Sequence, residues 1–260
     1  MSSRNLNARG NDRMPFSMRR PLITAAFGLV LLAAPAGAAT DVLYDGALGS
    51  TPDAQGWVYA SFPLTGAKET QSVDGATTLL DTTPAMRDMA GYFYTRPPEQ
   101  ALDRSIGFRL VFNLRIAEER HVNHHRAGFS LIVLSSDLKG VELAFWEDQI
   151  WAQTDRPLFT RGEASRPFST WAGLVSYTLA IHGDTYTLSA DGKPILSGPL
   201  KDYSSFRTPP FDFVYRQPNF IFFGDSTGSA AARIAIASIG LKTSAPGSLP
   251  KGTTSGDPAR

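Results

Sequence analysis

Apolar and polar residues alternate along much of the middle of this chain. Over residues 108–116 every second position is apolar, and most positions between them are polar. This period of two is the pattern of a β-strand with one buried face. Residues 127–134 are apolar at nearly every position, which favours a central strand covered on both faces. The buried set of the first strand is predicted to be Phe108, Leu110, Phe112, Leu114 and Ile116.

Further strand patterns follow one another with turn residues between them. Glycine beside aspartate is typical of tight hairpin turns. A last apolar alternation covers residues 233–241, helical patterns are scarce, and no strand–helix–strand alternation is present. The chain is therefore predicted to be all-β, an antiparallel two-sheet sandwich. The expected hairpin turns are Glu147-Asp148, Gly183-Asp184 and Asp191-Gly192.

Residues 1–38 have the three regions of a signal peptide. A basic segment precedes an apolar run over residues 21–32, and Ala36-Gly37-Ala38 supplies small residues for cleavage. The run is too short for a membrane span, which takes about 20 residues. We expect a secreted or periplasmic protein whose mature form has no integral membrane segment. The arginine pair at 19–20 leaves both the general and the twin-arginine export routes open.

The remaining chain divides into a domain at 39–242 and a tail. Residues 243–260 are rich in Thr, Ser, Pro and Gly and are predicted to be disordered. The chain has no cysteine, which favours a bacterial exported protein over a disulfide-bonded eukaryotic one. The chain has 25 basic and 24 acidic residues, and residues 1–38 contain five of the basic residues and one of the acidic residues. Residues 39–260 therefore carry a formal charge of about −3. A mildly acidic domain is not expected to bind nucleic acid.

Several segments resemble known families of sandwich domains. "YTLAIHGDTYTLSADGKPI" at 177–195, "GFRLVFNLRI" and "RIAIASIGL" resemble the strands of laminin-G-like and concanavalin A-like lectin/glucanase domains. The resemblance implies a jelly-roll sandwich. "LYDGALGSTPDAQGW", "RAGFSLIVLSSDLKGVELAFWEDQIWAQ" and "PNFIFFGDSTGSA" resemble bacterial exported choice-of-anchor domains, a likeness that implies no activity.

One sheet face is predicted to gather polar and aromatic side chains. If Phe129, Leu131 and Val133 point into the core, the alternate positions of these strands point away from it. Guanidinium, carboxylate, amide and indole groups on one face suit a polyol, because planar polar groups pair with hydroxyls and indoles stack on sugar rings. The alternative is a second packed surface with Arg126 and Glu142 as an ion pair. The predicted ligand-binding residues are Arg115, Arg126, Glu142, Trp146, Trp151 and Gln153.

Part of that face must be covered, because Ile132 and Leu134 share it. Loops such as 155–175 are expected to lie over it.

Two metal sites are considered from the sequence, each against an alternative without metal. Fold analogy suggests a structural calcium held by Asp45 and Asp225, against two ordinary capped turns. Residues 118–125 hold three of the four histidines, but they lie between strands and lack the helical spacing of a zinc motif, which favours a solvated loop.

Catalytic signatures are missing from the sequence. There is no acid-x-Asp-x-acid strand of a retaining glucanase, no Gln-x-His strand of a lyase, and no GxSxG, P-loop or dinucleotide motif. The leading hypothesis is therefore a non-catalytic, exported protein that binds a carbohydrate or glycan. The alternatives are a glycan-cleaving enzyme, either a glycoside hydrolase or a polysaccharide lyase, and a structural or adhesive envelope module.

Overall fold

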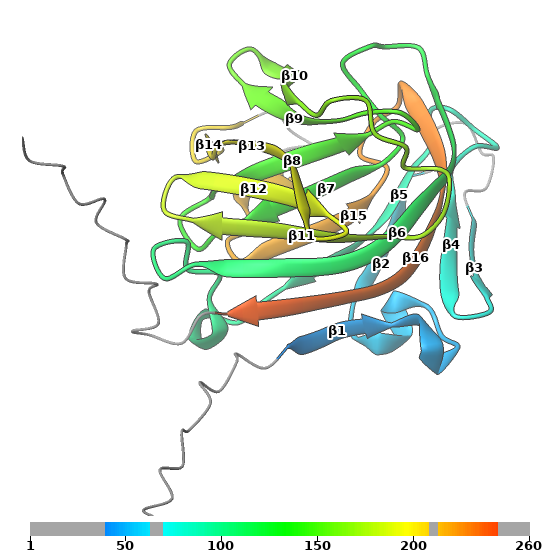
Figure 1. Ribbon diagram of the computed structural model, residues 1–260, viewed down its shortest axis with the longest axis horizontal. Helices are drawn as coiled ribbons and strands as arrows, with labels where there is room; N and C mark the ends of the chain where they lie inside the picture. Colours follow the sequence, from blue (N-terminus) through cyan, green and yellow to red (C-terminus); the bar gives the residue numbers. More distant parts are fainter. Residues whose placement is uncertain (1–39, 63–69, 208–212, 244–260) are drawn as a thin grey trace, which may run out of the picture. The chain divides into compact units, whose positions relative to one another are not determined.

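The computed structural model describes residues 40–62, 70–207 and 213–243, and these form two antiparallel β-sheets packed face to face (Figure 1). Sheet A has the strand order β13-β12-β11-β6-β16-β4-β3, with β1 also paired to β16. Sheet B has the order β10-β9-β8-β7-β15-β5-β2, with β14 also paired to β8. The prediction of an all-β, antiparallel two-sheet jelly-roll sandwich is confirmed. The predicted signal peptide and nearly all of the predicted tail lie outside the described residues.

The strands follow the alternation of the sequence. Within the described ranges, the ordered helices are four short 3-10 turns, and no helix there is long and apolar enough to cross a membrane. The turns are η1 (Gly46–Leu48), η2 (Pro52–Gln55), η3 (Pro98–Gln100) and η4 (Phe213–Arg216). The strands are β1 (Asp41–Asp45), β2 (Val58–Phe62), β3 (Thr70–Asp74), β4 (Thr77–Asp81), β5 (Met89–Thr95), β6 (Phe108–His121), β7 (Ser130–Leu134), β8 (Lys139–Phe145), β9 (Ile150–Asp155), β10 (Leu158–Ala164), β11 (Val175–His182), β12 (Thr185–Ala190), β13 (Lys193–Pro199), β14 (Lys201–Asp202), β15 (Phe220–Gly224) and β16 (Ala230–Thr243).

The main core lies between the two sheets. The five alternate apolar residues of β6 are all buried and face this core. Phe112 stacks on Tyr177 of β11 with ring centroids 5.2 Å apart, and it meets Phe223 of β15 edge-on at 5.3 Å. One aromatic side chain thus joins two strands of sheet A to the centre of sheet B. The predicted phase of β6 is confirmed.

Sheet B is covered on its outer face as well. Ile132 and Leu134 of β7, which point away from the main core, are fully buried. A second apolar cluster packs over them, with Phe159 from β10 and Tyr203 and Tyr215 from the segment after β14. The expected cover from residues 155–175 is therefore correct for Phe159. Further cover comes from Tyr203, Phe206, Val214 and Tyr215, which the sequence pattern does not predict.

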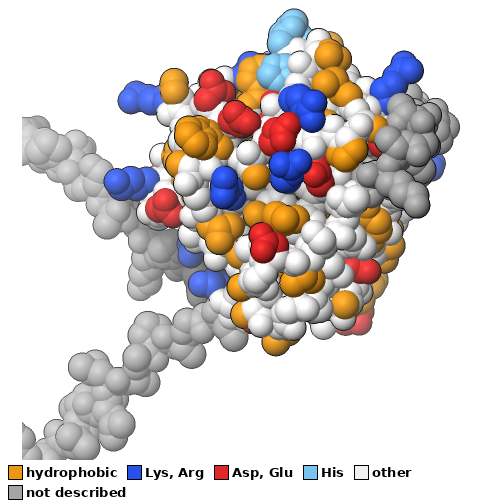
Figure 2. Space-filling model, turned by 90° about the vertical axis from the view of Figure 1, so that its right-hand side faces the viewer, with side chains coloured by type: hydrophobic (Ala, Val, Ile, Leu, Met, Phe, Trp, Pro, Cys, Tyr) orange, Lys and Arg blue, Asp and Glu red, His pale blue; other side chains and the backbone are white. Residues whose placement is uncertain are grey.

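The polar segment at 118–125 is not all loop. Residues 118–121 continue β6 and pair with residues 230–233 at the start of β16. This extension aligns Glu118 beside Arg233, and Arg233 bridges Glu118 at 3.4 Å and Asp81 at 2.9 Å. Ion pairs between strands explain why a stretch so rich in charge stays extended. Figure 2 shows the same mixture of acidic and basic side chains across one side of the sandwich.

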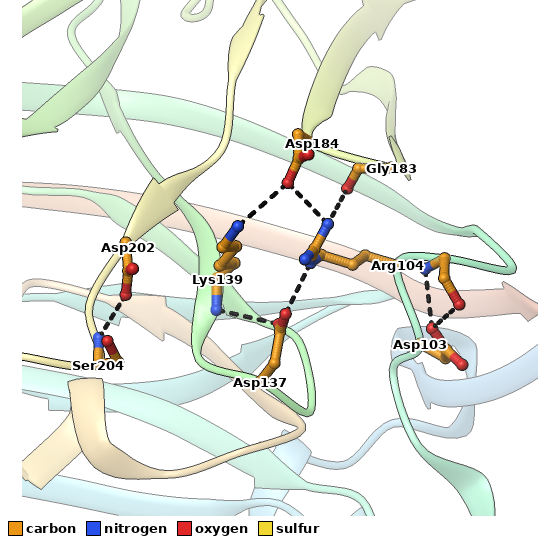
Figure 3. A network of polar contacts seen from close by, with 9 residues as sticks. Asp103, Arg104, Asp137, Lys139, Gly183, Asp184, Asp202 and Ser204 are labelled. Carbon is orange, nitrogen blue, oxygen red and sulfur yellow. Dashed lines mark hydrogen bonds and ion pairs between the residues drawn. The ribbon is translucent and has the colours of Figure 1, made fainter.

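An ion-pair cluster joins the turns of the two sheets at one end (Figure 3). Arg104, just before β6, donates to Asp137 in the β7–β8 turn at 2.8 Å and to Asp184 in the β11–β12 turn at 2.7 Å. Lys139 reaches Asp184 at 3.3 Å. Because both carboxylates of the cluster, Asp137 and Asp184, are exposed to solvent, each pair contributes at most about 1 kcal/mol. The cluster sets the alignment of three turns more than it stabilises the fold.

Candidate functional site

An open groove of about 880 Å³ lies beside the outer face of sheet B. Four segments form its walls: the residues before and at the start of β5, the loop after β6, the start of β10, and the turn between β15 and β16. Most of the lining side chains are hydrogen-bonding groups, and three are apolar. The lining residues are Arg87, Met89, Asn123, His125, Arg126, Leu158, Phe159, Thr160, Ser226, Thr227, Gly228 and Ser229.

Arg126 and Phe159 form the inner part of this groove. The guanidinium carbon of Arg126 lies 4.7 Å from the ring centroid of Phe159, a cation–π contact. Phe159 has a left-handed backbone conformation with φ of 57°, which is uncommon for a bulky residue. Its ring is held by Tyr215 and Phe206 at 5.4 and 5.5 Å. Tertiary packing therefore fixes the aromatic ring at the groove.

A buried polar network lies beneath Arg126. Glu142 of β8 is fully buried, and its carboxylate accepts hydrogen bonds from the Tyr215 hydroxyl at 2.7 Å and the Ser130 hydroxyl at 3.2 Å. Arg126 Nη1 lies 3.9 Å from a carboxylate oxygen of Glu142. Burial, with the nearby carboxylate, raises the pKa of Tyr215 well above its ordinary value, so this hydroxyl stays protonated and donates.

Arg126 and Glu142 therefore form the ion pair predicted as the alternative to an exposed binding face. Glu142 does not line the groove, because Tyr215 and the second apolar cluster cover it. It acts on the site through Arg126, whose charge it balances. Of the predicted ligand-binding residues, Arg126 alone lines the groove.

The two tryptophans do not form the exposed platform that a stacking site requires. Trp151 is fully buried, and Trp146 is half-buried against it with ring centroids 4.7 Å apart. Arg161 of β10 covers both rings, at 4.3 Å from Trp146 and 4.2 Å from Trp151. His121 stacks on Trp146 at 3.9 Å. The prediction of a paired-indole surface is wrong, because β10 folds over the face that the alternation assigned to solvent.

Trp146 and Gln153 instead hold the loop that borders the groove. The indole nitrogen of Trp146 donates to the Arg126 carbonyl at 2.9 Å, and the side-chain amide of Gln153 donates to the His125 carbonyl at 2.9 Å. His125 Nδ1 accepts from the Arg161 backbone at 3.2 Å. These bonds position the groove wall without placing Trp146 or Gln153 on the ligand side.

Arg115 lies on the other sheet. β6 belongs to sheet A, whereas β7, β8 and β9 belong to sheet B, so the outward residues of β6 face the opposite side of the sandwich. The guanidinium of Arg115 donates to the Trp171 carbonyl at 2.9 Å. Its predicted place beside Arg126 is therefore wrong. Alternation gives the phase of a strand, but it does not say to which sheet the strand belongs.

The two aspartates proposed for calcium are not neighbours. Asp45 pairs with Ser238, whereas Asp225 accepts from Thr82, which in turn bonds Ala232 at the other end of β16. Six residues of strand separate those anchor points, or about 20 Å. Each carboxylate caps a local turn, through the backbone nitrogens of Ala47 and Thr227. The shared calcium site is wrong.

The same conclusion holds for the residues considered for zinc. No group of three or more His, Asp or Glu side chains within the described ranges is placed to hold a metal ion. Two of the histidines, His124 and His125, contact each other with ring centroids 4.0 Å apart. Asp225 is buried, and burial raises its pKa well above the ordinary value.

Comparisons with known proteins identify the fold. No protein-family model and no curated protein matches the chain. A structure of the carbohydrate esterase vb_24B_21 from the Shiga toxin-encoding bacteriophage phi24B is 13% identical, with a TM-score of 0.54 over 80% of this chain and 100% of that one. A protein of unknown function with a galectin-like fold from Bacillus subtilis is 10% identical, with a TM-score of 0.51 over 78% of this chain and 96% of that one. These likenesses support the lectin-like sandwich, and the resemblance to choice-of-anchor domains stays a prediction.

Proposed function

We propose that this chain is a non-catalytic carbohydrate-binding protein whose ligand lies in the groove beside β10. The observation that carries the proposal is the composition of the groove wall. Amide, imidazole, guanidinium and hydroxyl groups alternate there with Phe159, Met89 and Leu158. A sugar presents hydroxyls at its rim and CH groups on its faces, so it needs both kinds of contact. The volume of the groove is in the range of small-ligand sites.

The carboxylates near the groove form hydrogen bonds within the protein and do not face the groove. Glycoside hydrolysis needs two carboxyl groups facing the scissile bond. Within the part of the chain that the structure describes, the groove lining contains no Asp or Glu. Glu142 is sealed beneath Tyr215, and both oxygens of Asp225 accept hydrogen bonds. We therefore propose binding without cleavage. The name of the phage protein, a carbohydrate esterase, accords with a ligand of this class.

Removing one groove arginine should weaken glycan binding. Arg87 is exposed and lines the groove, where its guanidinium can donate to sugar hydroxyls. Arg87→Ala should reduce affinity about tenfold, since a hydrogen bond from a charged group contributes about 1.5–3 kcal/mol. A glycan array identifies the ligand, and affinity electrophoresis in gels containing that glycan measures the loss.

Arg109→Ala is the matched control, because Arg109 is an exposed arginine on the outer face of sheet A. It should bind as the parent protein does. Equal retention of both variants would place the ligand outside the groove. Retention lost equally in both would indicate a general effect of charge.

We propose in addition that the protein is exported. The support is the order of basic, apolar and small-residue segments in residues 1–38. N-terminal sequencing of protein from the periplasm or medium should begin at Ala39. An uncleaved chain confined to the cytosol would contradict this proposal.

A further inference from the structure

A small apolar cavity opens beside the groove. It has a volume of about 90 Å³, and most of its wall is aromatic or aliphatic, including Phe93, Phe213, Val214 and Phe222. An engineered apolar cavity of about 150 Å³ holds benzene. A space of this smaller size suits a group of three or four heavy atoms.

The cavity and the groove share part of their lining. Met89, Arg126, Phe159 and Ser226 line both. A substituent on a sugar held in the groove can therefore enter the cavity while the ring stays outside. Such a substituent has to be short and mostly apolar, because, of the described residues that line the cavity, only Arg126, Asp225, Ser226 and Tyr215 bring polar side-chain groups to the wall.

The guanidinium of Arg126 has unused donor capacity. Its side chain is nine-tenths buried, and Nη1 is buried with no hydrogen-bond partner. Nη2 donates to the carbonyl and hydroxyl of Ser226 over long distances of 3.3 and 3.5 Å. Buried donors in proteins are normally satisfied, so an unsatisfied one at a cavity wall points to an absent acceptor. A guanidinium held this loosely can turn to meet it.

The acceptor is expected to be neutral. The charge of Arg126 is already balanced by Glu142 at 3.9 Å. Asp225 is the acidic residue among the described residues that line the cavity, and it offers an anion no positive charge in this buried, weakly polar setting. A carbonyl oxygen takes the hydrogen bond without adding a second negative charge. The group that fits is therefore short, apolar at one end and a carbonyl at the other.

We propose that this cavity is a subsite for the acyl group, of acetyl size, carried by an acylated sugar. The methyl group packs against the aromatic wall, and the carbonyl oxygen accepts from Arg126. This inference rests on the proposed carbohydrate-binding function, and it names the ligand class as acetylated glycans.

The test compares glycans that differ only in acetylation. An array carries acetylated xylan beside alkali-deacetylated xylan, and chitopentaose beside its deacetylated form. The xylan pair is the cleaner comparison, because its deacetylation introduces no charge. We expect the acetylated form of the bound glycan to bind at least tenfold more tightly.

Equal binding of both forms overturns the acyl subsite and leaves the proposed function standing, whereas no retention of any glycan contradicts both. Binding that requires a carboxylate sugar, probed with polygalacturonate, also overturns the subsite.

A cavity-filling variant separates the cavity from the groove. Ala60 of β2 lines the cavity but not the groove, so Ala60→Leu fills the space and removes no existing contact. We expect the variant to keep its fold by circular dichroism and to lose the preference for acetylated glycan. Ala180→Leu, the same exchange at an outward position of β11 in the other sheet, should keep the preference. An unchanged preference in Ala60→Leu overturns the proposal.

Discussion

Replacing Phe112 by alanine should lower the free energy of unfolding by about 3–5 kcal/mol, which is the range for removing a buried aromatic ring from a packed core. Phe112 is fully buried and contacts rings in both sheets, Tyr177 at 5.2 Å and Phe223 at 5.3 Å. Neither neighbour can collapse into the cavity without leaving its own strand. Urea unfolding followed by circular dichroism measures the loss.

Arg109→Ala is again the control for this exchange, because Arg109 lies on the same strand with its side chain exposed. Its expected effect lies within about 0.5 kcal/mol, as for other surface substitutions. A loss of less than about 1 kcal/mol in Phe112→Ala would mean that the side chains of β6 face the opposite way.

Replacing Glu142 by leucine should be comparably damaging, at about 3–5 kcal/mol, for an electrostatic reason. The change leaves the Arg126 guanidinium, itself nine-tenths buried, without its nearest carboxylate. It also removes the acceptor of the Tyr215 and Ser130 hydroxyls. Removing one partner of a buried ion pair lowers the free energy of unfolding by more than the intact pair contributes to it, because the remaining charge is buried without a partner. Urea unfolding again provides the measurement.

A second exchange distinguishes lost pairing from lost packing. The double variant Glu142→Leu with Arg126→Met removes both charges, and pairs replaced in this way are often close to neutral. We expect the double variant to be more stable than Glu142→Leu alone. If it is less stable, the two effects add, and Glu142 contributes through its packing rather than through Arg126.

The sequence predicts the strands well because the signal is local. The alternation at 108–116 and the apolar run at 127–134 report directly which side chains are buried, and both appear as core strands. Hairpin turns are local as well. Gly183 and Asp191-Gly192 adopt the positive φ values that such turns need, with φ of 61°, 47° and 78°. Residues adjacent in sequence contain all of this information.

The site is less predictable because it depends on pairing between distant segments. Arg115 and Arg126 are eleven positions apart in the numbering, yet Arg115 lies on sheet A and Arg126 lies in the loop that leads into sheet B. Trp151 would be exposed on an isolated hairpin, but Arg161 of β10 covers it. Nothing local predicts the role of Phe159, because its left-handed backbone and its contacts with Phe206 and Tyr215 arise only in the folded chain. The sequence favours a solvated loop around His125, and its place in the groove wall depends on contacts with β9 and β10.

The position of the last two strands has a consequence for how the chain is made. β15 lies between β7 and β5 in sheet B, and β16 lies between β6 and β4 in sheet A. Each therefore fills the middle of its sheet, and each is synthesised after the strands on both sides of it. A nascent chain that ends before residue 220 lacks one inner strand in each sheet. Each sheet then exists as two parts that are not paired with each other. The sandwich can close only once residues 220–243 have been synthesised, and contacts so far apart in sequence are typical of slow-folding proteins. Until then the edges of β4, β5, β6 and β7 lack their partners, and unpaired strand edges can pair with other chains.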